Sequence, residues 1–246
     1  MKFRLLFMSV IALALLLASC APPELRDQNL LRDDSLLTDD PCEAPCWRGI
    51  TPGVTTWSAA LTILEDDPTL SNVTTQQDEA SAARVAEFQQ EGGAAGCCQM
   101  YSEDGETVSV IFLRTAPTVT LGQLIESKGD PSYVLGTPFS DNQAIVNLVY
   151  PDLSLVIYAF VAGAEGSLSE TSEIIGVLYV TPEDMELLIL TSELHAWEGY
   201  QSYNVYSDQS PYEVTPAITM TPTGTITPQA DGTPESTAEA TESAGS

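Results

Sequence analysis

The chain has few basic residues and a single histidine. Its 246 residues include eight Lys and Arg against 35 Asp and Glu, which gives a formal charge of -27. A surface this anionic argues against nucleic acid as a partner, because phosphates are bound through Lys and Arg. The acidic residues match no calcium-loop pattern. We interpret them as a solvated surface that keeps the protein soluble.

Familiar catalytic motifs are also missing from the sequence. It contains no G-x-S-x-G, no S-x-x-K and no G-x-x-x-x-G-K-[ST], and its one histidine, His195, cannot form H-E-x-x-H. We expect His195 to lie on the surface near a helix end. Paired carboxylates could hydrolyse glycosides, but so many scattered acids single out no pair. The prediction is a protein without catalytic residues, metal or cofactor, and not an enzyme.

Aromatic residues are few, and two interpretations of them stay open. A carbohydrate or peptide platform is one, and packing inside the domain is the other. The helical spacing of Trp57 favours the core, and the tyrosines, about three residues apart, favour a last segment packed back onto the domain. The residues concerned are Trp47, Trp57, Tyr200, Tyr203, Tyr206 and Tyr212.

One apolar run opens the chain. It extends from Leu5 to Ala18, interrupted only by Ser9, and it follows Lys2 and Arg4. This length suits the hydrophobic region of a signal peptide and falls short of the roughly 20 residues that a spanning helix needs. The sequence therefore predicts an exported protein.

The run ends in Leu17-Ala18-Ser19-Cys20, which resembles the lipobox of bacterial lipoproteins. The resemblance implies that residues 1–19 are removed and that Cys20 carries fatty acyl chains such as palmitate. The alternative is an ordinary secretory signal that contains a cysteine. Two or three acyl chains hold a protein stably on a membrane. We expect a lipid anchor at Cys20 in the cell membrane, facing the extracytoplasmic side, or in the outer membrane of a diderm organism.

Three zones follow the signal peptide. Residues 20–41 comprise the lipidated cysteine and a polar tether, expected to be flexible and to span about 25 Å. Residues 42–212 contain the strong apolar periodicity and are predicted to form one folded domain. Residues 213–246 contain four Thr-Pro pairs and no aromatic residue. This composition predicts a disordered tail, with an O-glycosylated stalk as the alternative.

Apolar spacing predicts three helices and five strands in the folded zone. The helices are expected around 57–64, after Thr55-Thr56, around 121–125, and from Thr181 to about Trp197. Asp67-Pro68 and Gly129-Asp130-Pro131 end the first two. The predicted strands are Arg84–Phe88, Val108–Leu113, Ala144–Tyr150, Leu153–Phe160 and Ile174–Val180.

A weak repeat relates the two halves of the folded zone. Leu61 to Pro68 has the same spacing as Leu124 to Pro131, 63 residues further on, and each copy leads from a helix into strands. Two helix-then-sheet units predict an α+β fold in which helices pack on one face of an antiparallel sheet.

Two segments carry a resemblance to a known family. Ile50-Thr51-Pro52-Gly53-Val54-Thr55 and Leu124-Ile125-Glu126-Ser127-Lys128-Gly129-Asp130-Pro131 resemble the I-x-x-G-x-T and L-G-x-P pattern of BamE and its SmpA/OmlA relatives. These are small envelope lipoproteins with two helices on a three-stranded sheet. The resemblance covers about thirty residues and implies two tandem BamE-like units. The four additional cysteines and the acidic tail depart from the family.

Four cysteines besides Cys20 indicate disulfides in an exported chain. A bond between the neighbours Cys97 and Cys98 is strained. The favoured pairing therefore joins Cys42 and Cys46 across to Cys97 and Cys98. A four-thiolate zinc site is the alternative, which adjacent cysteines fit poorly.

Together these features predict a membrane-anchored extracytoplasmic lipoprotein that acts as a noncatalytic binding or scaffold module of the cell envelope. Its expected partners are the membrane, through Cys20, and an envelope protein. The alternative is a solute- or polymer-binding lipoprotein, and the third choice is an envelope hydrolase that uses carboxylates. A binding protein should show a pocket with converging polar groups, and a scaffold a flat or grooved apolar patch.

Overall fold

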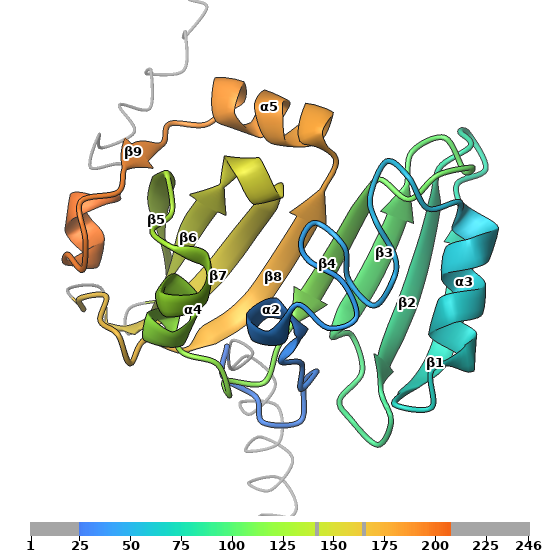
Figure 1. Cartoon of the computed structure of the whole chain (residues 1–246), viewed down its shortest axis with the longest axis horizontal. Coiled ribbons are helices and arrows are strands. Elements are labelled where there is room, and N and C mark those ends of the chain that lie inside the picture. The colour runs from blue at the N-terminus through green and yellow to red at the C-terminus, as the bar shows by residue number, and fades with distance from the viewer. Residues whose placement is uncertain (1–24, 141–142, 164–165, 208–246) are drawn as a thin grey trace, which may run out of the picture. The chain divides into compact units, whose positions relative to one another are not determined.

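The computed structural model describes residues 25–140, 143–163 and 166–207, in which nine strands form a single antiparallel sheet (Figure 1). The order of the strands across the sheet is β1-β2-β3-β4-β8-β7-β6-β5-β9. The strands are β1 Leu70–Gln77, β2 Arg84–Gln90, β3 Cys98–Ser102, β4 Val110–Arg114, β5 Tyr133–Ser140, β6 Gln143–Tyr150, β7 Leu155–Ala162, β8 Ile174–Val180 and β9 His195–Ala196. The helical segments are α2 Ser35–Thr38, α3 Trp57–Asp66, α4 Leu121–Lys128, η2 Pro151–Leu153, α5 Pro182–Thr191 and η3 Tyr203–Val205.

The sheet consists of two halves of the same design. In each half a helix leads into four successive antiparallel strands, α3 into β1 to β4 and α4 into β5 to β8. The last strands of the halves, β4 and β8, pair with each other, and this pairing joins the halves into one sheet. The outer strand of the first half is β1. The outer strand of the second half is β5, and the short β9 pairs along its outer edge.

Threonines begin all three longer helices, as the sequence predicts for α3 and α5. The Thr56 hydroxyl accepts a hydrogen bond from the Ala59 amide at 3.4 Å, and that of Thr181 from the Asp184 amide at 3.1 Å. Thr120 and Gln123 form a reciprocal capping box at the start of α4. These bonds satisfy amides that have no partner inside the helix.

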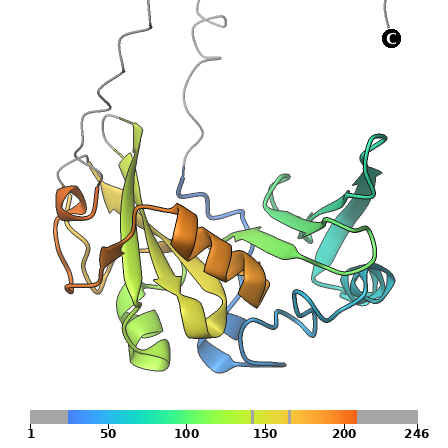
Figure 2. The ribbon, with the colours of Figure 1, turned by 90° about the horizontal axis from the view of Figure 1, so that it is seen from above.

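The core has two parts, one on each face of the sheet. Buried residues of α2, α3 and α4 pack with alternate strand residues into the larger cluster, and Figure 2 shows these three helices along one side of the sheet. The other face of the second half packs against Met185 of α5, through Val149, Val156 and Val180. Successive strand residues point to opposite faces, so neighbours such as Val156 and Ile157 belong to different clusters.

The predicted fold class is wrong. The structure is dominated by the nine-stranded sheet and has only short helices, which lie on both of its faces rather than on one. Each half has four strands, so two three-stranded units do not describe it. The strands missing from the prediction include β1, whose polar residues lack apolar alternation, and β5, which contains Gly136 and Pro138.

Packing begins well before Cys42, where the folded zone was expected to start. Leu30 and Leu31 are 2% and 1% exposed, and Leu36 of α2 is also buried. Leu31 forms a bridge to Thr115 beyond the end of β4. The segment from residue 25 onward is therefore part of the domain and not a flexible tether, because its leucines complete the larger core cluster.

The last helix is shorter than predicted. α5 ends at Thr191, and the chain then turns back along β5, where β9 pairs with Tyr133 and Val134. Tyr206 is 1% exposed and Tyr203 is 5% exposed, which confirms that these tyrosines pack the last segment onto the domain. Within the described residues, no helix is long and apolar enough to cross a membrane.

Candidate functional site

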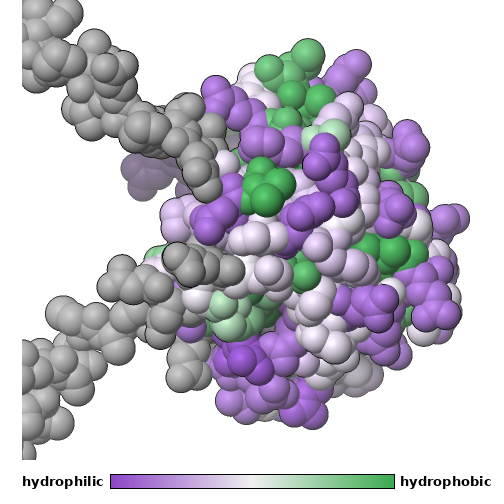
Figure 3. Space-filling model, turned by 90° about the vertical axis from the view of Figure 1, so that its left-hand side faces the viewer, coloured by the Kyte–Doolittle hydropathy of each residue, from purple (hydrophilic) through white to green (hydrophobic). Residues whose placement is uncertain are grey.

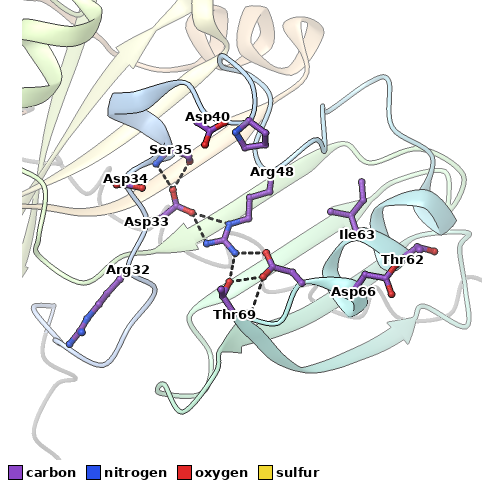
Figure 4. Close-up of a pocket in the computed structure, with 12 residues that line it drawn as sticks. Arg32, Asp33, Asp34, Ser35, Asp40, Arg48, Thr62, Ile63, Asp66 and Thr69 are labelled. Carbon is purple, nitrogen blue, oxygen red and sulfur yellow. Dashed lines mark hydrogen bonds and ion pairs between the residues drawn. The ribbon is translucent and has the colours of Figure 1, made fainter.

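A hollow of about 560 Å³ lies between the N-terminal segment and the end of α3 (Figure 4). We call it the Arg48 hollow, after the side chain at its centre. It is lined by Arg32, Asp33, Asp34, Ser35, Asp40, Pro41, Arg48, Thr62, Ile63, Asp66, Asp67 and Thr69. Its volume lies within the range of small-molecule sites.

A tight turn places Arg48 in this hollow. Trp47 and Ile50 exchange two backbone hydrogen bonds of 2.9 and 2.8 Å, so Arg48 and Gly49 form a two-residue turn. Both turn residues have positive φ, 49° and 85°, as a type I′ turn requires. Arginine is unfavourable in this backbone region. Its presence there suggests that the side chain is needed.

The guanidinium of Arg48 joins two parts of the chain. It donates to Asp33 at 3.2 Å on one side and to Asp67 at 2.5 Å and Thr69 at 2.7 Å on the other. Asp33 also accepts the indole N–H of Trp47 at 2.9 Å. The side chain of Arg48 is 19% exposed and that of Asp33 is 7% exposed. This partly buried network ties the N-terminal segment to the end of α3.

Two groups have shifted pKa values: Asp67, which lines the hollow, and the buried Tyr179, which lines a smaller cavity together with Asp33. Burial opposes ionisation of Asp67, but hydrogen bonds from Thr69 and Arg48, with the Arg48 charge, outweigh it and lower its pKa below the ordinary 3.8. Burial raises the pKa of Tyr179, and the charge of Asp33 raises it further. Asp67 therefore stays ionised and Tyr179 stays protonated near neutral pH, and neither suits acid–base catalysis there.

The remaining acidic side chains of the hollow offer negative charge, and no histidine or cysteine lies beside them in the lining. Asp34, Asp40 and Asp66 form no ion pair with the described residues, and Figure 4 shows Asp40 and Asp66 apart from the guanidinium. Across the described ranges, no three His, Cys, Asp or Glu side chains are grouped to hold a metal ion. Chemically, the hollow can attract a cationic or hydroxylated group.

His195 follows the end of α5 at Thr191 by four residues and lies in a short strand instead of in the helix itself. It belongs to β9, where it pairs with Val134, and its ring centre is 6.4 Å from that of Tyr206. It does not line the Arg48 hollow.

The aromatic residues do not form an open platform. Trp47 is fully buried and stacks on Phe88 with ring centres 5.6 Å apart, and Trp57 is 4% exposed. Tyr206 stacks on Trp197 and donates its hydroxyl proton to the Gly199 carbonyl at 2.8 Å. Tyr200 alone of the three described candidate tyrosines is exposed, at 39%.

Apolar groups on the side that carries β5 and β9 form separate patches (Figure 3). Polar surface lies between these patches in that view, so no continuous apolar face is seen there. The exposed apolar residues of this part of the fold include Phe139, Tyr200 and Val205.

The four cysteines form two disulfides, as the sequence predicts, but in a different pairing. Cys42 bonds to Cys46 and Cys97 bonds to Cys98, so the predicted cross-links are wrong. Cys97 and Cys98 lie in the core at the start of β3, 1% and 0% exposed. Cys42 and Cys46 are four residues apart, and the Cys42 sulfur accepts a hydrogen bond from the amide of Gly49 in the Trp47 turn at 3.3 Å. The described cysteines therefore offer no free thiol for a zinc site or for nucleophilic catalysis.

The other predicted sites lie outside the described residues. These are Cys20 with the signal peptide, Tyr212, and the tail from residue 213.

Sequence reasoning missed the central residues of the hollow, Arg48, Asp33 and Asp67. One signal could have found Arg48. In a chain with eight basic residues, it stands in an Arg-Gly pair between Trp47 and Ile50, a sequence that suits a tight turn. Its partners are brought to it by tertiary packing, which no local pattern encodes.

Comparisons with protein-family models, with curated proteins and with solved structures each find no match to this chain.

Proposed function

We propose that this protein is a membrane-anchored extracytoplasmic lipoprotein that acts as a noncatalytic binding or scaffold module of the cell envelope. The observation that carries the proposal is the state of the Arg48 hollow. The Arg48 guanidinium at its centre is paired with Asp33 and Asp67, and the lining contains no histidine or cysteine. Such a site suits binding better than group transfer.

The two disulfides support the proposed compartment. Disulfides persist outside the cytoplasm and are rare within it. Of the two pairs here, Cys97–Cys98 is buried in the core and Cys42–Cys46 is partly exposed. The lipobox-like Leu17-Ala18-Ser19-Cys20 then supplies the anchor. These two arguments are independent, since one rests on the disulfides within the domain and the other on the N-terminal sequence.

The anchor is tested by changing Cys20→Ser in the full chain and labelling cells with an alkyne analogue of palmitate. The expected result is loss of the label and loss of the mature protein from the membrane fraction. Ser19→Ala is the matched control, because it keeps a small residue before the cysteine and should still be labelled. A Cys20→Ser chain that reaches the membrane at mature size would contradict the anchor.

The binding role is tested by affinity capture with the tagged full chain from detergent-solubilised envelope. A stoichiometric partner should be retained, and retention should survive His195→Ala. A turnover activity that one carboxylate substitution abolishes, with the fold intact, would contradict the noncatalytic role.

A solute-binding lipoprotein is the second candidate, favoured by the volume and the open carboxylates of the Arg48 hollow. Spermidine is a suitable cationic probe. Calorimetric binding of spermidine that Asp40→Asn with Asp66→Asn removes would favour this candidate over the scaffold.

A further inference from the structure

The outer strands of the two halves, β5 and β1, differ in whether another strand pairs with their outer edge. In the second half, the outer edge of β5 is covered by the chain itself, because β9 pairs with Tyr133 and Val134. Further along, the Gly136 amide donates to the Tyr206 carbonyl at 2.6 Å. In the first half, β1 is the equivalent strand, and within the described residues it pairs only with β2. The repeated design therefore leaves one of two equivalent edges without a strand.

The pairing of β1 with β2 shows which backbone groups face outward. Asp78 donates its amide to the Ala83 carbonyl at 3.0 Å, and the register continues with Gln77 opposite Arg84 and Thr75 opposite Ala86. Hydrogen-bonded and non-hydrogen-bonded pairs alternate in an antiparallel ladder. Thr75 and Gln77 thus occupy non-hydrogen-bonded positions, and their N–H and C=O groups point away from β2.

The outward edge lacks the usual protection against pairing. Edge strands are commonly blocked by charged residues, by proline or by a bulge. In β1, Leu-Ser-Asn-Val-Thr-Thr-Gln-Gln, there is neither charge nor proline, in a chain with 35 acidic residues. The irregularity between Ser71 and Thr74 affects only one end. From Thr74 to Gln77 the strand is regular and its residues are exposed.

Acidic residues lie at both ends of this uncharged strand. Glu65 and Asp66 precede it at the end of α3, and Asp78 and Glu79 follow it. Hydrogen bonds from the Ala80 amide and the Ser81 hydroxyl lower the pKa of Asp78, so this carboxylate is ionised at neutral pH. An antiparallel second copy would bring the acidic end of one β1 against the acidic end of the other. Charge complementarity instead favours an occupant with basic ends.

We propose that β1 is the edge at which an extended segment of a partner protein, with basic residues at both ends, adds as a further antiparallel strand. Backbone hydrogen bonds to Thr75 and Gln77 hold the segment, and the flanking carboxylates select its charge. This inference rests on the proposed function as a binding module and names the site of that binding.

Synthetic peptides test the proposal without any change to the protein. The probe is a fluorescent peptide Lys-Lys-Val-Thr-Val-Thr-Val-Lys-Lys, and its anisotropy is measured with the purified full chain in detergent. Three control peptides are used. One carries Glu in place of Lys, and the other two carry N-methyl groups on alternate residues, one in each of the two phases. We expect binding of the lysine peptide, at least tenfold weaker binding of one N-methylated form, and no binding of the Glu peptide. Equal binding of both N-methylated forms would show mere electrostatic adsorption and overturn the proposal, as would no binding of the lysine peptide.

Variants of β1 locate the binding edge. Thr75→Pro removes an outward N–H and leaves every β1–β2 hydrogen bond in place, as proline does on an edge strand. It should weaken lysine-peptide binding at least tenfold, whereas Thr75→Ala, which keeps the N–H, should stay within twofold. Gln77→Pro provides a second variant if Thr75→Pro changes the far-ultraviolet circular dichroism. Unchanged binding in a folded proline variant would overturn the assignment to β1.

Sedimentation of the same variants separates a second copy from a partner. The proposal expects the same oligomeric state for wild type and Thr75→Pro, and a dimer lost in Thr75→Pro would show that a second copy occupies the edge and overturn it. Envelope capture distinguishes this failure from failure of the proposed function. A partner retained equally by wild type and Thr75→Pro would overturn the edge site alone, whereas no partner in either would count against the binding module itself.

Discussion

At the scale of single residues, Arg48 is the side chain that ties the N-terminal segment to the end of α3. It bridges Asp33 and Asp67, and its guanidinium carbon lies 5.0 Å from the centre of the Trp47 ring. Arg26 makes similar contacts in a more exposed place. It pairs with Glu173 and lies 5.2 Å from the ring centre of Phe160, with 49% of its side chain exposed. The two arginines therefore differ in burial and in their number of carboxylate partners, which is two for Arg48 and one for Arg26.

Arg48→Met should lower the free energy of unfolding by about 3 kcal/mol, because it leaves the nearly buried Asp33 without its cation. Arg26→Met, the matched control, should lower it by less than about 1 kcal/mol, since an exposed ion pair contributes little. Urea denaturation of both variants measures the two changes. Equal losses would show that the partly buried Arg48 network contributes no more to stability than the exposed Arg26 pair.

Asp67 makes the stability of the protein depend on pH. Its pKa is lower in the folded protein than the ordinary 3.8, so its contribution to stability is present above pH of about 4 and is lost as pH falls through the folded pKa. The difference in unfolding free energy between wild type and Asp67→Asn should therefore be largest near neutral pH and shrink below about pH 4. Urea titrations at several pH values measure it, and a difference that grows on acidification would contradict the assignment.

At the scale of elements, the cover on β5 depends on one glycine. A Cβ at Gly136 would stand 2.9 Å from the Tyr203 ring and 3.0 Å from the Tyr203 carbonyl oxygen. Because the second of these is a backbone atom, η3 would have to move. Gly136 thus permits the last segment to lie directly against the outer strand.

Gly136→Ala should lower the free energy of unfolding by about 1–3 kcal/mol through overpacking. It should also expose the segment of β9 and η3 to limited proteolysis at protease concentrations that leave wild type intact. Thr137→Ala, at the next and exposed position, is the control and should change stability by less than about 0.5 kcal/mol. Proteolysis at the wild-type rate in Gly136→Ala would show that the last segment tolerates the added methyl group.

The sequence was informative where an element is strongly amphipathic or capped, and uninformative elsewhere. Helix starts at Thr56 and Thr181 and the strand Ile174–Val180 are as predicted, because capping side chains and continuous apolar runs are local signals. β1 was missed because an exposed edge strand needs no apolar face. The disulfide pairing could not be predicted, since it depends on how the Trp47 turn and β3 are placed in the core.

At the scale of the whole molecule, the large negative net charge of the chain disfavours the folded state. The chain has eight basic residues against 35 acidic ones, and two of the eight precede Cys20. Such an excess of one sign destabilises the folded state through repulsion between its own charges. The partly buried Arg48 pairs are less screened by salt than the exposed carboxylates.

Raising NaCl from about 10 mM to about 150 mM should therefore raise the midpoint of thermal unfolding, because the Debye length falls from roughly 30 to 8 Å. Differential scanning calorimetry measures the midpoint. Arg48→Met should show a rise at least as large as wild type, since it lacks the attractive pairs that salt weakens. A midpoint that falls with added salt would show that attractive pairs outweigh repulsion.

The early start of packing limits how far an anchored domain could reach. If Cys20 carries the lipid, five peptide units separate it from Leu25, and a fully extended chain of that length spans at most about 18 Å. A few residues further on, Leu30 and Leu31 are buried and fix the chain to the domain. The protein would then search for partners within a thin layer rather than through a volume. That confinement raises its effective concentration toward proteins seated in the same membrane and disfavours those free in solution.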